Sequence, residues 1–269
     1  MPSTAPYVEL HCHSGYSFLD GASHPEELVL RAKALGYPAL ALTDHDGLYG
    51  AMEFARFAKG EGIQPITGAE VTVDPASVEG LEGWAAAAGA GSASLFRGFP
   101  GEERPGAVDG ARRHPDAGLH LTLLAETPPG YANLCRLLTE AHTGAAERGE
   151  PRLPFPSLLE GSEGLICLTG CRRSPLLAAL DDAVATAEAV ARRLRDAFGP
   201  EGLFVELQDN LVRHDARRLQ ALGRLADRLG LPVVATGNVH YHRPGRHRLQ
   251  DALVAIRTRS TLDGSHALR

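Results

Sequence analysis

The chain has 269 residues, of which 43% are hydrophobic, so it can bury a sizeable core as one large domain or two ordinary ones. Its formal net charge of −6 argues against a protein that holds nucleic acid by charge alone, and its four cysteines are too few for a disulfide scaffold. The first residues lack a secretory signal, and no apolar run approaches the roughly 20 residues of a membrane span. We therefore expect a cytoplasmic protein with no membrane contact.

Strand-like and helix-like segments alternate along the chain. Seven short runs rich in leucine or β-branched residues predict strands, at 7–12, 39–43, 63–73, 119–125, 164–170, 203–207 and 232–237. Segments with helical spacing separate most of them. Repeated strand and helix units favour a parallel sheet with right-handed crossovers, either open or closed into a barrel. Seven units over about 250 residues favour the barrel.

Turn and capping residues agree with this alternation. Ser23, followed by Pro25 and Glu27, predicts a helix start capped by Ser23. Glycines with left-handed backbone are expected to end four helical segments, at Gly36, Gly62, Gly199 and Gly230.

The composition changes at two places, which sets the predicted domain limits. Residues 75–118 are rich in Ala, Gly, Pro and charged residues without a sustained period, which predicts a partly disordered surface insertion. We predict a barrel domain over 1–245, and the start of a further helical segment over 246–269. The chain stops abruptly after that helix, which suggests a fragment of something longer.

His11 and His13 are the first residues whose chemistry stands out. Successive side chains of a strand point to opposite faces, so the two imidazoles share a face while Cys12 points the other way. The pair could bind one ion at the carboxyl end of the first strand, where such folds place their active sites. The alternative is two histidines that are near each other by chance.

Two further strand ends carry polar side chains. The TDHDG segment follows the second strand. A helix cap explains Asp44, and a turn before a helix at Leu48 explains Asp46, but neither explains His45. After the third strand, Glu70 is a lone carboxylate in an apolar run, which is costly to bury without compensation.

Later strands add weaker candidates, since a strand-end histidine or a single thiol is often an ordinary core residue. They are His120 at the start of the fourth strand, Cys171 after the fifth, Glu206 in the sixth, and Asn238, His240 and His242 after the seventh. Repetition at nearly every strand end makes coincidence improbable.

Nitrogen and oxygen donors with one thiolate suit Zn²⁺, Mn²⁺ or Fe²⁺. The donors outnumber the ligands of one tetrahedral ion, which indicates two or three ions. Such clusters generate hydroxide near neutral pH and hold a phosphoryl group, so the predicted reaction class is phosphoester hydrolysis. No side chain is predicted as the nucleophile.

The motifs HCH, TDHDG, GAE, LTGC and NVH, in this order, resemble the polymerase and histidinol phosphatase (PHP) domain family. The resemblance implies a distorted seven-stranded (βα) barrel, similar to a TIM barrel, with a trinuclear site at the carboxyl ends of its strands. The segments HCHSGYSFLDGASHPEEL, GYANLCRLL and LQDALVAIR are similar to the N-terminal domain of bacterial C-family DNA polymerases of the DNA polymerase III alpha type, in the error-prone branch.

The resemblance implies a ligand set for two or three divalent ions, zinc or manganese. The implied ligands are His11, His13, Asp20, His45, Glu70, His120, Cys171, Asn238 and His240. The family commonly has an aspartate where this chain has Asn238, whose amide brings no charge, so that one ion would be weaker or absent. Arg172, beside Arg173, could steady a phosphate, although a solvated pair fits equally well.

The resemblance implies the PHP portion of an error-prone DNA polymerase used in damage-induced mutagenesis and translesion synthesis, with the polymerase active site outside this chain. Its partners would be DNA and other replication or mutagenesis proteins. The domain itself could hydrolyse a phosphodiester at a DNA 3′ end. Two alternatives stay open, namely a metal-stabilised structural domain without turnover and a free-standing phosphatase.

Overall fold

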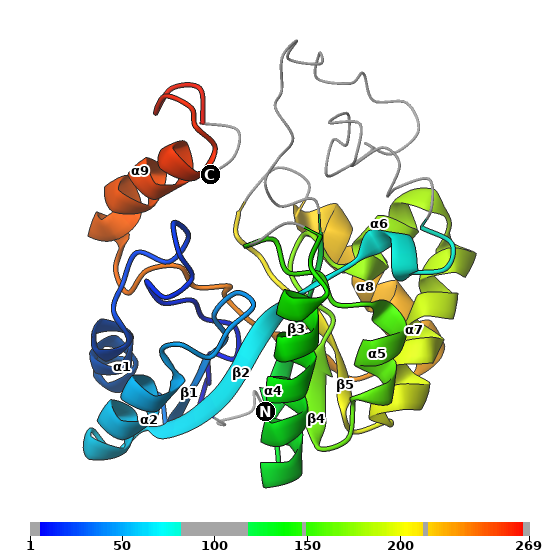
Figure 1. The fold of residues 1–269 in the computed structure, drawn as a ribbon, viewed down its shortest axis with the longest axis horizontal. Coiled ribbons are helices and arrows are strands. Elements are labelled where there is room, and N and C mark those ends of the chain that lie inside the picture. Colours follow the sequence, from blue (N-terminus) through cyan, green and yellow to red (C-terminus); the bar gives the residue numbers. More distant parts are fainter. Residues whose placement is uncertain (1–5, 82–117, 147–148, 212–214, 266–269) are drawn as a thin grey trace. The chain divides into compact units, whose positions relative to one another are not determined.

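A computed structural model describes residues 6–81, 118–146, 149–211 and 215–265 of the chain (Figure 1). The chain forms two compact units. Unit 1 comprises Met1–Glu70, Leu123–Ala125 and Thr236–Arg269, and unit 2 comprises Val71–Thr122 and Glu126–Ala235.

Unit 1 is built on a parallel strand pair with two helices beside it. Strand β1 pairs with β2, from Ala39 opposite Gln64 to Leu42 opposite Thr67. Helices α1 and α2 lie side by side next to β1 (Figure 1), and they bury Leu28 and Phe54 in a common core with Cys12. The elements are α1 (Pro25–Ala34), β1 (Ala39–Leu42), α2 (Ala51–Gly60), most of β2 (Gln64–Val73), η2 (Pro244–Arg246) and α9 (His247–Arg257).

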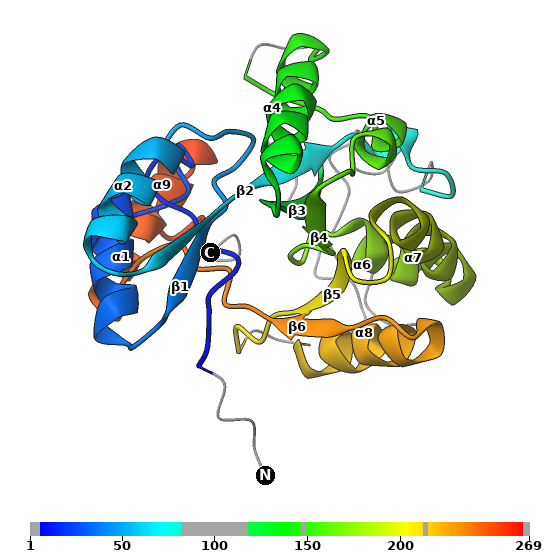
Figure 2. The same cartoon turned by 90° about the horizontal axis from the view of Figure 1, so that it is seen from below.

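Unit 2 holds the remaining strands, with helices between them along the chain. Strand β4 pairs with β5 in parallel, with Cys167 opposite Leu203, and β5 pairs with β6, with Val205 opposite Val233. Helices α7 and α8 both lie beside β5 and contact each other (Figure 2). The elements are η1 (Pro75–Ser77), most of β3 (Leu119–Ala125), α4 (Pro128–Thr143), α5 (Phe155–Glu160), β4 (Leu165–Leu168), α6 (Pro175–Asp182), α7 (Val184–Phe198), β5 (Leu203–Leu207), α8 (Asp215–Leu229) and β6 (Val233–Ala235).

The strands follow one another in the sheet in the order of the sequence, from β1 to β6. The predicted α/β class is therefore confirmed, although the described residues form six strands rather than seven. The missing one is the first, since 7–12 makes only isolated parallel bridges, Glu9 to Leu40 and Cys12 to Val239. The Glu9 carboxylate accepts hydrogen bonds from the amides of His11 and Gly237, donors that a regular strand would give to its neighbours.

The predicted helix ends are confirmed at their glycines and wrong at two starts. Gly36, Gly62, Gly199 and Gly230 all have positive φ. The cap of α1 is His24 rather than Ser23, because the Glu27 carboxylate accepts from the His24 amide while the Ser23 hydroxyl bonds His242. Helix α2 begins at Ala51, with Gly50 before it, rather than at Leu48.

Most of the predicted insertion at 75–118 lies outside the described residues, which resume at Gly118. The division predicted at residue 245 stays a prediction. In the parts of the chain that the structure describes, no helix combines the length and apolar character needed to cross a membrane.

Candidate metal centre

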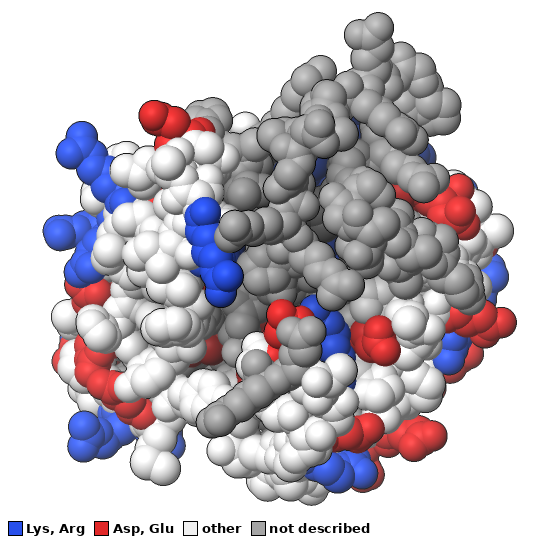
Figure 3. Space-filling view, turned by 45° about the horizontal axis from the view of Figure 1, so that its top comes forward, with Lys and Arg blue, Asp and Glu red and all other residues white. Residues whose placement is uncertain are grey.

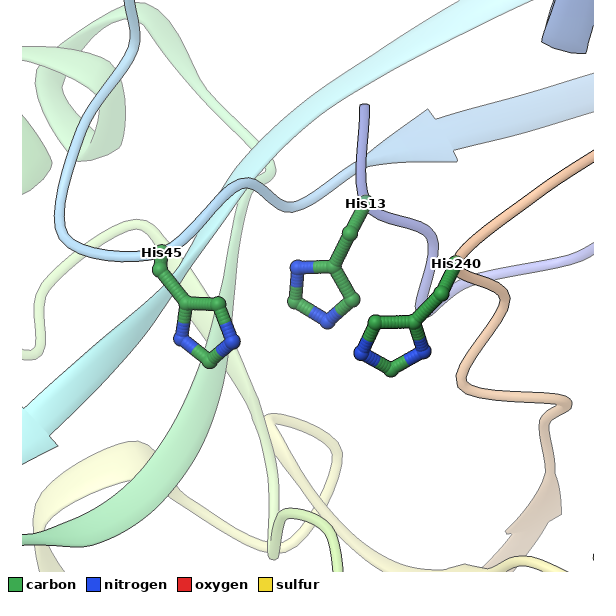
Figure 4. Close-up of side chains that lie close together, drawn as sticks. All are labelled: His13, His45 and His240. Atoms are coloured by element: carbon green, nitrogen blue, oxygen red, sulfur yellow. The ribbon is translucent and has the colours of Figure 1, made fainter. Parts of the chain in front are cut away.

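Three histidines from distant parts of the sequence come together in unit 1. The His13 ring lies 4.6 Å from the His45 ring and 4.8 Å from the His240 ring, centroid to centroid, and both pairs are stacked (Figure 4). The His11 ring is 5.0 Å from that of His13. An isolated parallel bridge pairs Cys12 with Val239, the residues that precede His13 and His240, and so brings these two histidines together.

Asp20 joins this group from the loop that follows the HCH segment. Its Oδ2 lies 3.0 Å from His45 Nε2 and 3.0 Å from His240 Nε2. Burial alone would raise the pKa of Asp20, but the charge and hydrogen bonds of the two histidines hold that pKa well below its ordinary value. The carboxylate is therefore ionised over the whole neutral range.

The loop that presents Asp20 is tightly built. The Asp20 amide donates to the Ser17 carbonyl at 2.9 Å, and Leu19 has a positive φ of 59°. A Cβ on Gly21 would lie 1.8 Å from the Ser14 carbonyl oxygen, so only glycine fits there without displacing the loop.

Glu70 is the second carboxylate of the group. It is 1% exposed, and its oxygens lie 3.4 Å from His11 Nε2, 3.7 Å from His13 Nε2 and 3.1 Å from His45 Nδ1. An isolated parallel bridge pairs it with His45, which fixes their separation. The 3.1 Å contact with His45 Nδ1 supplies part of the compensation that a buried carboxylate requires.

His13 is fully buried among the other histidines. Burial, together with the charges of His45 and His240, holds the pKa of His13 well below its ordinary value. Its imidazole is therefore neutral at pH 7, the form that binds a metal. Its Nε2 lies 3.1 Å from Asn238 Oδ1, and Asn238 has a φ of 48°, a left-handed conformation that Asn and Asp adopt more readily than other side chains.

Asp44 is neither a helix cap nor a member of this group, which corrects its predicted role. Its carboxylate accepts from the Ser14 amide at 2.6 Å, from the Ser14 hydroxyl at 2.8 Å and from the Ser17 hydroxyl at 2.8 Å. The Ser17 hydroxyl also accepts from the His45 amide at 3.0 Å. This network ties the Asp20 loop to the segment that carries His45.

Unit 2 holds the two remaining predicted ligands. Cys171 Sγ lies 3.7 Å from His120 Nδ1, and both side chains are buried. Gly170, with a φ of 90°, packs so closely on the His120 carbonyl that a Cβ would lie 2.2 Å from its oxygen. Glu206, whose role the sequence left open, supports this turn, since its carboxylate accepts from the Gly170 amide at 3.0 Å.

Arg172, the predicted phosphate contact, is exposed. Burial of Arg218 and, second to it, the positive charge of Arg172 lower the pKa of Arg218 to about 10. Arg218 also pairs with Asp215 in α8. Arg172, which follows Cys171 in the sequence, therefore lies near enough to Arg218 for the two charges to interact. Phosphate binding by Arg172 stays a prediction.

The spacing of the unit 1 donors suits metal ions. Ligands about 2.1 Å from a tetrahedral ion lie about 3.4 Å from one another. The contacts of Asp20 and Glu70 with the histidines span 3.0–3.7 Å. Groups of nitrogen and oxygen donors close enough to share an ion are His13 with His45 and His240, and His11 with His13 and Glu70. The residues present therefore fit zinc or manganese, whereas Cys12 lies in the apolar core, as expected.

Arg257 is a neighbour of this group that sequence reasoning missed. It lies in the last turn of α9, and its guanidinium forms an ion pair with Asp20 Oδ1. The two residues are 237 positions apart, and no local pattern links them.

Comparison with known proteins agrees with the fold and the motifs. The model of the PHP domain family matches residues 9–210. An error-prone DNA polymerase of Nocardia farcinica is 44% identical over 97% of this chain and 24% of its own length. An error-prone DNA polymerase of Mycobacterium bovis is 39% identical over 98% of this chain and 21% of its own length. The chain thus spans about a fifth to a quarter of these relatives.

Among solved structures, an amidohydrolase from Chromobacterium violaceum, described with bound SO4 and no metal, matches with a TM-score of 0.53. The match covers 91% of this chain and 96% of the other, at 18% sequence identity. At that identity the similarity shows a shared fold.

Proposed function

Because the chain belongs to the PHP domain family, we propose that it is the N-terminal domain of an error-prone DNA polymerase that takes part in translesion synthesis and damage-induced mutagenesis. The similarity of nearly the whole chain to two such polymerases supports this proposal. The nucleotidyl-transfer site would lie in the remainder of the longer protein. A cytoplasmic location, and partners that include DNA and other replication or mutagenesis proteins, belong to the same proposal.

For the domain itself, the proposed activity is metal-dependent hydrolysis of a phosphodiester at a DNA 3′ end. The observation that carries it is the convergence of four histidines and two carboxylates in unit 1, with donor separations suited to metal ions. The proposed ligands are those that the family resemblance implies: His11, His13, Asp20, His45, Glu70, His120, Cys171, Asn238 and His240. Two or three zinc or manganese ions would activate water and neutralise the charge of the phosphoryl group.

The residues of the chain would prepare this site in specific ways. His13 is held neutral, so no proton has to leave it before it binds a metal. Asp20 and Glu70 supply negative charge that balances the cations. Basic and acidic side chains are interspersed on the described part of the face in Figure 3, so the proposed DNA contact is local to the centre and to Arg172.

Degradation of a labelled oligonucleotide tests the activity. The purified chain, stripped of metal and then supplied with Mn²⁺ or Zn²⁺, should release mononucleotides from the 3′ end of single-stranded DNA. The Glu70→Gln variant should lose this release, because the amide keeps the shape of the side chain but not its charge. Glu163→Gln, an exposed change in unit 2, is the matched control. Equal release by wild type and Glu70→Gln would contradict the assignment.

A metal-stabilised domain without turnover is the second candidate. The observation that favours it is Asn238, which faces His13 Nε2 with a neutral amide oxygen. The centre therefore has one negative charge fewer than it would have with the aspartate that the family commonly has at this position. In this case metal would raise the melting temperature of the chain while no mononucleotide appears at any metal concentration.

A further inference from the structure

Arg257 divides the two oxygens of Asp20 between different partners. Its guanidinium pairs with Oδ1, while Oδ2 lies 3.0 Å from both His45 Nε2 and His240 Nε2. We propose that Arg257 is a positioning residue of the metal centre, which holds Asp20 so that only Oδ2 is available to an ion. This inference rests on the proposed metal-dependent function.

The position of Arg257 is fixed by the docking of α9 within unit 1. Val254 and Ala255, on the same helix, are buried. At the other end of α9, Arg246 pairs with Glu27 of α1 and donates to the Ala22 carbonyl, in the segment that follows Asp20. Because both ends of the helix are held, its last turn brings the guanidinium to Asp20 in a defined place.

The environment of the pair makes it strong. The Asp20 side chain is 7% exposed and that of Arg257 is 20% exposed, so water screens their attraction only in part. A guanidinium also offers several N–H donors in a rigid plane, which orients a carboxylate better than a single ammonium does. The contact is therefore suited to setting the direction of a side chain, and not merely to balancing its charge.

Carboxylates bind metals through one oxygen or through both, and hydrogen bonds from surrounding residues decide which. With Oδ1 engaged by Arg257, Asp20 can bind through Oδ2 alone, on the side where the two histidines lie. Loss of such a supporting contact commonly weakens metal binding by about 10-fold to 100-fold. The positive charge of Arg257 acts in the opposite direction, since it repels a cation, so the sign of the measured change separates orientation from repulsion.

The test uses the full chain in four forms: wild type, Arg257→Gln, Arg257→Lys and Arg248→Gln. Arg248 lies on the same helix and is exposed, which makes it the matched control. Metal-free protein is titrated with Mn²⁺ and with Zn²⁺ in a calorimeter. We expect affinity about 10-fold to 100-fold weaker for Arg257→Gln, an intermediate loss for Arg257→Lys and no change for Arg248→Gln.

A spectroscopic reading distinguishes orientation from a general structural role. When Co²⁺ replaces the native ion, its visible absorption weakens as the number of ligands rises. If Asp20 binds through both oxygens once Arg257 is gone, the Arg257→Gln spectrum should weaken per bound ion, whereas a change that only loosens α9 should lower the melting temperature and leave the spectrum of the bound ion intact.

Equal or tighter binding by Arg257→Gln would overturn the inference, and tighter binding would mean that repulsion dominates. A wild-type chain that binds neither Mn²⁺ nor Zn²⁺ would overturn the proposed function along with it, whereas wild-type binding with an unaffected Arg257→Gln variant would overturn the inference alone. If Arg257→Gln fails to fold by circular dichroism, Arg257→Lys decides, since binding equal to wild type would contradict the proposal and weaker binding would support it.

Discussion

Asn238 places its Oδ1 3.1 Å from His13 Nε2, from a backbone with a φ of 48°. A neutral amide thus stands where a carboxylate could face a buried imidazole. The left-handed conformation tolerates Asp as well as Asn, so the charge can be changed here without strain in the backbone.

Replacing Asn238 with Asp should therefore strengthen the metal centre. We expect about tenfold tighter binding, or one additional equivalent of metal, because the new carboxylate adds a charged oxygen donor. Metal content after dialysis and calorimetric titration measure both. Asn133→Asp, which adds the same charge on the surface of α4 in unit 2, serves as the control, and an equal gain in that variant would mean that overall charge alone is responsible.

Gly21→Ala should damage the loop that carries Asp20. The added Cβ would meet the Ser14 carbonyl oxygen at 1.8 Å, which forces the loop to move and lowers the free energy of unfolding by about 1–3 kcal/mol. Urea denaturation of the metal-free chain measures this loss. The same change at Gly60 in α2, where nothing lies within 4 Å, should be neutral or stabilising by up to about 1 kcal/mol. Similar losses at both positions would contradict the steric argument.

The stability of the metal-free chain should fall with acidification. The pKa of His13 is well below 6.5 in the folded state, so the unfolded chain takes up a proton that the folded chain does not. The contribution of His13 to the free energy of unfolding is therefore fully present above pH 6.5 and is lost as the pH falls below it. The free energy of unfolding then changes by up to about 1.4 kcal/mol per pH unit for one proton.

Urea denaturation at a series of pH values between 6.5 and 3.8, the ordinary pKa values of His13 and Asp20, measures this slope. His13→Gln should reduce it, while the same substitution at the exposed His247 should leave it unchanged. A His13→Gln variant with the wild-type slope would show that another group binds the proton.

Cys171→Ser tests the proposal that Cys171 is a metal ligand. With Co²⁺ bound, wild type should show the near-ultraviolet charge-transfer band of a thiolate ligand, and Cys171→Ser should lack it. Cys167→Ser, at a buried thiol of β4 in the same unit, should keep the band because burial raises the pKa of Cys167 and keeps its thiol protonated. Loss of the band in that control instead would assign the ligand to Cys167.

Features set by local sequence were predicted well. The strand at 119–125 and the one at 203–207 have the bounds predicted, because each is a sharp apolar run between turn residues. The gathering of His13, His45 and His240 also followed from a general rule, since the carboxyl ends of parallel strands lie along one edge of a sheet.

Features that depend on tertiary contacts were not predictable. The Glu9 carboxylate takes backbone donors from His11 and Gly237, and no strand propensity could indicate that this would interrupt the first strand. The role of Asp44 similarly depends on Ser14 and Ser17, which approach it only in the folded chain. The pairing of Asp20 with Arg257 joins two segments that share no local pattern.

Unit 1 is discontinuous, since Thr236–Arg269 reaches it only after the whole of unit 2 has passed in the sequence. The contact between Asp20 and Arg257 closes a loop of 237 residues, and contacts of such long range form late in folding because chain entropy opposes them. During synthesis, His240 emerges from the ribosome after all six strands of the described residues have been made. A nascent chain therefore lacks His240 and Arg257 until these six strands have been made, so the proposed metal centre can be completed only after them.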